Sequence, residues 1–181
     1  NTNADKKNME GILNNWKKKQ DSEKPLLVVI STSGGGHRSA TFTMSVLQSL
    51  DSLTKGGIMK KTFLITGASG GMIGATYFRE LFLRRQQGQN ISLQDPQYVD
   101  DIAGDLLNPV FTSFFARDLI SPAQKFSVGP YRYVKDRGYA FEQKLNSNTR
   151  GFLNKQLKDY VNHEKAANIP LMFFNSVVSR D

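Results

Sequence analysis

Two apolar runs, each followed at once by glycines and then by a helical pattern, constrain the fold of this chain more than any other feature. The first run, PLLVVIST, covers residues 25–32, and the second, TFLIT, covers residues 62–66. The first is continuous and rich in β-branched residues, which is typical of a strand covered on both faces of a parallel sheet. The repeated order of strand, glycine turn and helix predicts a parallel α/β sheet with right-handed crossovers.

The helical patterns after these runs predict which residues each helix buries. After the first run, one helical face carries Phe42, Val46, Leu47, Leu50 and Leu53, and the pattern ends at Gly56 and Gly57. After the second run, a helix beginning near Gly71 carries Ile73, Tyr77, Phe78, Leu81 and Phe82.

The remaining chain is less regular. We expect helices over residues 98–107 and 149–164 and a final strand over residues 169–178. Several aromatic residues lie between these elements, and we expect most of them to pack in the core and two or three to face lipid: Phe111, Phe114, Phe115, Phe126, Tyr131, Tyr133 and Tyr139. The predicted fold is a three-layer α/β/α sandwich with a mostly parallel central sheet.

A polar, lysine-rich lead-in over residues 1–24 precedes the domain of residues 25–181. Helical spacing there places Met9, Ile12, Leu13 and Trp16 on one stripe. Three lysines over residues 17–19 flank the stripe. Such a helix either lies on a membrane surface or packs on its own domain, and the sequence leaves both interpretations open.

Composition narrows the chemistry. The chain has no cysteine and only two histidines, His37 and His163, so thiolate catalysis and zinc centres rich in histidine or cysteine are not expected. No apolar stretch is long enough to span a bilayer. The net charge of +8 favours acidic partners, but no nucleic-acid-binding signature accompanies it, so we expect no nucleic-acid partner.

A candidate nucleophile lies where the second run meets its helix. Residues 67–71 read GASGG and fit the G-x-S-x-G pattern of a nucleophile elbow around Ser69. A sharp turn of this kind strains the serine backbone, and small residues such as Gly67 and Gly71 let strand and helix pass closely. The serine hydroxyl is then exposed at the positive end of a helix, where an oxyanion is electrostatically favoured.

A glycine loop follows the first run and opens the preceding helix. It reads SGGGHR over residues 33–38, and its glycines Gly34, Gly35 and Gly36 can turn their amides toward one anion. In neighbouring strand–helix units of one sheet, this loop and Ser69 should lie side by side. An acyl hydrolase needs this pairing of a nucleophile with preorganised oxyanion donors.

The pair of motifs, in this order and spacing, resembles the patatin-like phospholipase family over about residues 25–87, and SGGGHR is most similar to the loop of cytosolic group IV phospholipases. The resemblance implies a serine–aspartate dyad without histidine or metal. It implies that Ser69 attacks the ester of a phospholipid or other acyl-ester lipid at a membrane surface, that Gly34, Gly35 and Gly36 hold the oxyanion, and that Arg38 holds a lipid phosphate or the loop. No cofactor is implied.

The dyad aspartate is not found at the expected motif. The family places it in a downstream Asp-Gly pair, and this chain contains none. We expect it beyond the end of the chain rather than at Asp181, because Asp181 is too close to Ser69 along the sequence for that role and both ends look truncated. A lipid-binding module that has lost its base is the alternative. His37 occupies the variable position of the loop and is expected at a pocket rim, and His163 is expected to be solvated.

A dehydrogenase is the rival interpretation. Residues 66–74 resemble the TGxxxGxG loop of short-chain dehydrogenases, and Tyr131 and Lys135 mimic their catalytic pair. However, the glycine spacing is one residue too long, a strand–helix unit precedes the loop, and Tyr131 comes too early and outside a long helix. Absence of nicotinamide cofactor binding would exclude this interpretation.

Overall fold

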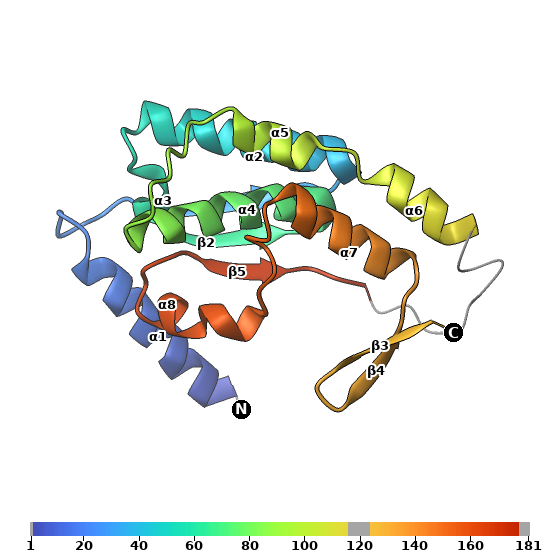
Figure 1. Cartoon of the computed structure of the whole chain (residues 1–181). Coiled ribbons are helices and arrows are strands. Elements are labelled where there is room, and N and C mark those ends of the chain that lie inside the picture. The colour runs from blue at the N-terminus through green and yellow to red at the C-terminus, as the bar shows by residue number, and fades with distance from the viewer. Residues whose placement is uncertain (1, 116–123, 178–181) are drawn as a thin grey trace.

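The structure is a computed structural model that describes residues 2–115 and 124–177. Its main sheet has the order β1-β2-β5, from Val28–Thr32, Thr62–Gly67 and Leu171–Phe174. Both outer strands pair with β2 in parallel, which confirms the predicted parallel α/β arrangement (Figure 1). The first strand begins at Val28 rather than residue 25, and the last spans a shorter stretch than the predicted 169–178, of which residue 178 lies outside the described residues.

Helices form most of the remaining described structure. They are α1 (Thr2–Lys18), α2 (Gly36–Leu53), α3 (Ile58–Lys61), α4 (Ser69–Gln86), α5 (Gln97–Ala103), α6 (Leu107–Ser113), α7 (Arg137–Asn148) and α8 (Val161–Lys165), with a 3₁₀ turn at Leu157–Tyr160. A separate antiparallel hairpin pairs β3 (Lys125–Val128) with β4 (Tyr131–Val134). Among the described helices, none combines the length and apolar character that a bilayer crossing requires.

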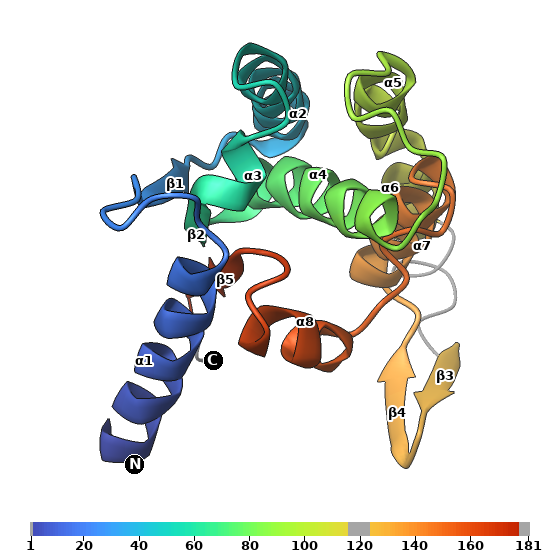
Figure 2. The ribbon, with the colours of Figure 1, turned by 90° about the vertical axis from the view of Figure 1, so that its left-hand side faces the viewer.

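The described elements cover the two faces of the sheet unequally. Helices α2 to α5 lie on one side (Figure 2), and there Ile30, Ile65 and Met172 pair across the strands and contact the core. The opposite face includes Val29, which is 53% exposed. Coverage of the first strand on both faces was therefore a wrong prediction, because no described element covers Val29.

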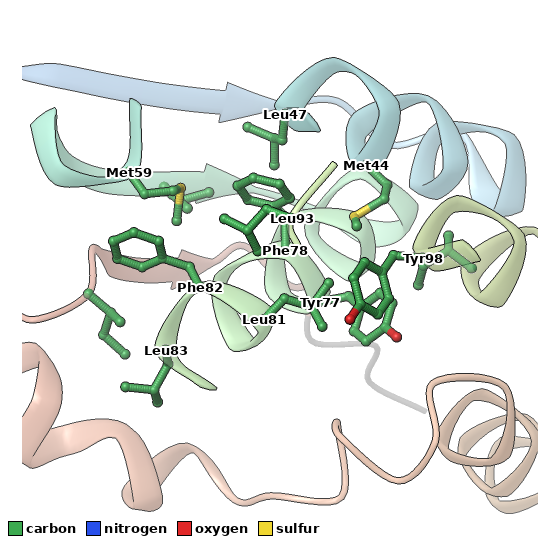
Figure 3. Close-up of a cluster of buried hydrophobic side chains, with 14 of the residues drawn as sticks. Met44, Leu47, Met59, Tyr77, Phe78, Leu81, Phe82, Leu83, Leu93 and Tyr98 are labelled. Carbon is green, nitrogen blue, oxygen red and sulfur yellow. The ribbon is translucent and has the colours of Figure 1, made fainter. Parts of the chain in front are cut away.

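The core is built around α4 (Figure 3). Tyr77, Phe78, Leu81 and Phe82 are at most 2% exposed, as the helical pattern predicts. Helix α2 differs, because it buries Ala40, Met44, Leu47 and Asp51, whereas Phe42, Val46 and Leu53 are 70%, 36% and 80% exposed. The predicted face of α2 was wrong at these three positions because α2 packs through the face that meets α4. Close approach there depends on Gly74, where an added Cβ would lie 2.2 Å from the Ala40 carbonyl oxygen.

The lead-in forms the predicted helix. Trp16 of α1 is 5% exposed and its ring packs edge-to-face on Phe63, with centroids 6.1 Å apart. This end of α1 packs on its own chain. Most other residues of α1 are exposed.

The second half of the chain departs most from the predicted helices. The helix expected over 98–107 ends at Ala103, and the helix expected over 149–164 is largely absent. Instead, α7 precedes it, because the Asp136 carboxylate accepts a hydrogen bond from the Tyr139 amide at 3.0 Å and starts the helix. Gly151, with φ of 73°, donates to the Asn146 carbonyl oxygen beyond the end of α7 and turns the chain away.

The aromatic residues of this region were also wrongly expected in the core. Four of the seven are exposed, namely Phe111, Phe115, Tyr131 and Tyr133. The other three, Phe114, Phe126 and Tyr139, are half-buried. All seven aromatic residues belong to α6, the residues after it, the β3–β4 hairpin or α7. None of these segments supplies a large share of the main core around α4.

Candidate active site

Ser69 lies at a strained turn between β2 and α4. Its φ is 55°, a left-handed value that is uncommon for a residue with a side chain. Strain of this kind costs about 1–3 kcal/mol and persists only where the surrounding structure enforces it. The Ser69 side chain is exposed, and Ser69 is the first residue of α4. The turn therefore presents a hydroxyl at a helix N-terminus.

Glycines make this turn possible through contacts with backbone atoms. A Cβ on Gly67 would lie 2.3 Å from the Thr32 carbonyl oxygen, and one on Gly71 would lie 2.3 Å from the Ser33 carbonyl oxygen. The sequence pattern identifies these two positions. It does not identify Gly70, where a Cβ would lie 1.8 Å from the Gly36 carbonyl oxygen. The spacing of small residues at 70, 71 and 74 along one helix was the available signal.

The triglycine loop lies beside Ser69. Thr32 pairs with Gly67 across the parallel strands, so the loop and the turn leave the sheet at the same level. A Cβ on Gly34 would lie 3.5 Å from the Ser69 Cβ. Gly35 and Gly36 have φ values of 142° and 61°, which a residue with a side chain rarely adopts.

Two helix N-termini meet at this point. Neither α2 nor α4 has a side chain that caps its first backbone amides. The first amides of a helix have no partner within the helix, and the helix dipole adds positive potential there. The Ser39 hydroxyl also donates to the Ser33 carbonyl oxygen at 2.7 Å, which fixes the start of the loop. The local field thus favours negative charge beside Ser69.

His37 and Arg38 have different environments. The Nε2 atom of His37 lies 2.6 Å from the Ile102 carbonyl oxygen, and because that oxygen can only accept, Nε2 carries the proton. His37 is half-buried and lines the cavity beside Ser69, at the rim position expected for it. Arg38 is exposed, and within residues 2–115 and 124–177 its guanidinium has no carboxylate partner.

An apolar cavity of about 180 Å³ adjoins the turn. Ser69, Gly36, His37 and Gly70 line it together with six apolar residues: Ala40, Ile73, Ile102, Leu106, Phe141 and Leu145. A larger, more open groove of about 650 Å³ between α6 and α7 does not include Ser69. The sequence motifs gave no indication of the cavity, since its walls come from helices far apart in the chain.

Two candidate residues named from the sequence, Asp181 and Tyr131, are not among the described residues that line the cavity at Ser69. Asp181 lies outside the described residues, so the expectation that it is not the dyad aspartate stays a prediction. Tyr131 lies in strand β4 rather than on a helix, unlike the tyrosine of the dehydrogenase pair.

Within the described part of the chain, no cluster of three histidine or carboxylate side chains could hold a metal ion. Comparisons with protein-family models, curated proteins and solved structures find no match to this chain.

Proposed function

We propose that the protein is a serine acyl hydrolase of the patatin-like kind, which cleaves fatty acyl esters, including those of phospholipids, through an acyl-Ser69 intermediate. The observation that carries the proposal is the exposed Ser69 at φ 55°, at the start of α4 and against Gly34 of the triglycine loop. A structural serine in an ordinary turn has no need of a strained backbone or of a glycine loop against its side chain.

The chemistry follows from these groups. A general base takes the proton of the Ser69 hydroxyl as its oxygen attacks the ester carbonyl carbon. The carbonyl electron pair moves onto oxygen, and the amides around Gly34, Gly35 and Gly36 stabilise that oxyanion. Collapse breaks the bond to the alcohol, which leaves with the proton. Water then repeats the sequence on the acyl-enzyme and releases the fatty acid. The base is an aspartate, as in the serine–aspartate dyad that the motifs resemble.

The proposal includes the three-layer fold of a patatin-like domain. A patatin-like domain has a third layer of helices, and the apolar residues Val29 and Leu64 on the open face of the sheet would pack against it. Neither a metal nor an organic cofactor takes part in the reaction as proposed.

A membrane surface is the proposed location of the substrate. The β3–β4 hairpin supports this, because Val128, Tyr131 and Tyr133 are exposed beside Lys125 and Arg132. Aromatic and basic side chains together suit the interface of an anionic bilayer.

Active-site labelling tests the proposed function. A fluorophosphonate probe should form a bond between its phosphorus and the Ser69 oxygen and release fluoride, because the probe mimics the tetrahedral intermediate. In a full-length protein that includes the dyad aspartate, we expect one adduct per chain and complete loss of labelling in Ser69→Ala. Ser49→Ala, an exposed serine on α2, is the matched control and should label like the wild type. Absence of any adduct would favour a lipid-binding module, and an adduct on another residue would contradict the assignment.

Arg38 supplies a second prediction. If its guanidinium binds a lipid phosphate, Arg38→Ala should slow phospholipid hydrolysis by about tenfold, the size of one exposed charge-assisted hydrogen bond. Hydrolysis of a neutral short-chain ester should be unchanged, and Lys24→Ala, which removes another exposed cation, should affect neither substrate. Equal loss on both substrates would instead indicate that Arg38 supports the loop.

A further inference from the structure

The cavity beside Ser69 has the chemistry of an acyl-binding site. Of the ten described residues that line it, six are apolar, and Ser69 alone carries a hydroxyl group. Among these described residues His37 alone is titratable, and its Nε2 is occupied by the Ile102 carbonyl oxygen. A charged or strongly polar group would find few partners inside the cavity. An alkyl chain would find contacts on every apolar wall.

The apolar residues that line the cavity are buried or half-buried and belong to helices that pack together. Ala40, Ile102 and Leu106 are at most 4% exposed. Phe141 and Leu145 are spaced by one helical turn on α7 and are half-buried. The hydrogen bond from His37 to Ile102 ties the start of α2 to α5, so two of the helices that line the cavity are joined directly.

The volume sets a limit on the chain that fits. An apolar cavity of about 150 Å³ holds benzene, a molecule of six carbon atoms. The cavity at Ser69 has about 180 Å³, so it has room for roughly six or seven carbon atoms by the same measure. Long fatty acyl chains would have to leave part of their length outside.

We propose that this cavity selects short acyl chains, of about four to seven carbon atoms, and that Phe141 and Leu145 set the upper limit. This inference rests on the proposed function, because it takes the acyl carbon to be bound at Ser69. Within the cavity each additional methylene should increase the rate of reaction with Ser69 by about fourfold. Beyond the limit, further methylenes find no room in the cavity and should slow the reaction.

A series of alkylphosphonate p-nitrophenyl esters tests the limit without requiring turnover. Each reagent transfers its phosphonyl group to the Ser69 oxygen and releases p-nitrophenolate, and intact-protein mass spectrometry gives the rate. We expect the rate to rise from ethyl through butyl to hexyl, and to fall at least about tenfold between hexyl and dodecyl. Leu145→Ala should move the optimum to a longer chain. Leu157→Ala removes an exposed leucine outside the cavity and should leave the optimum at hexyl.

The outcomes separate the two proposals. If no reagent modifies Ser69, the proposed hydrolase function fails. If Ser69 is modified at rates that do not depend on chain length, or fastest by dodecyl, the function stands and the acyl limit is overturned. Circular dichroism checks the fold of Leu145→Ala. Phe141→Leu, a smaller truncation of a half-buried residue, gives an independent shift of the optimum if Leu145→Ala is unfolded.

Discussion

Gly70→Ala should destabilise the protein by about 3 kcal/mol or more and abolish labelling of Ser69. The added Cβ would lie 1.8 Å from the Gly36 carbonyl oxygen and 2.7 Å from its carbonyl carbon. Both atoms belong to the backbone at the start of α2, so no side-chain rotation can relieve the clash. The two helices must separate, and the triglycine loop then moves away from Ser69. Guanidinium unfolding gives the stability, and a fluorophosphonate probe gives the reactivity.

A matched substitution separates this clash from the general effect of replacing glycine. Gly11 lies within α1, and an added Cβ there meets no atom within 4 Å. Gly11→Ala should therefore leave stability unchanged or raise it by up to about 1 kcal/mol, because alanine favours the helix. If Gly70→Ala unfolds at the same denaturant concentration as the wild type and still reacts with the probe, the close approach of α2 and α4 is wrong.

The second large effect concerns a buried carboxylate on α4. The Glu80 side chain is fully buried and accepts hydrogen bonds from Arg84 Nε at 2.6 Å, Lys155 Nζ at 2.6 Å and the Tyr160 hydroxyl at 2.8 Å. Burial, and secondly the Glu80 charge, raises the pKa of Tyr160, so its hydroxyl keeps the proton that it donates. Glu80 therefore joins α4 to the segment around residues 155–160.

We expect Glu80→Ala to lower the free energy of unfolding by about 3–5 kcal/mol, because two cations would lose their buried partner. Glu142→Ala removes a carboxylate of the same charge from an exposed position on α7 and should change stability by less than about 0.5 kcal/mol. Similar unfolding curves for the two variants would show that the Glu80 network does not hold these elements together.

The fold was predictable from the sequence where its cause is local. The elbow at Ser69 and the glycine loop depend on neighbouring residues, and the motifs identified both. The pattern of α4 identified Phe78 and Leu81 as core residues. It gave no sign that Glu80 is buried as well, since two of its three partners lie 75 and 80 residues further along the chain.

The rest of the site depends on contacts between distant segments. Ile102, Phe141 and Leu145 reach the cavity only because α5 and α7 pack near the start of α4. Helix α7 was not predicted, because the apolar residues of this region are irregularly spaced. Its ends are set instead by the local contacts of Asp136 and Gly151. A wall built from two such distant segments leaves no periodic pattern in the sequence.

The most direct test of the account is to trap the acyl-enzyme. The full-length protein, with the dyad aspartate present, is mixed with p-nitrophenyl hexanoate, quenched in acid within seconds and digested. The peptides are then measured by mass spectrometry. We expect a hexanoyl group on the peptide that contains Ser69, and none in Ser69→Ala. A hexanoyl group that persists in Ser69→Ala on another side chain, or a peptide around Ser69 that is never acylated, would contradict it.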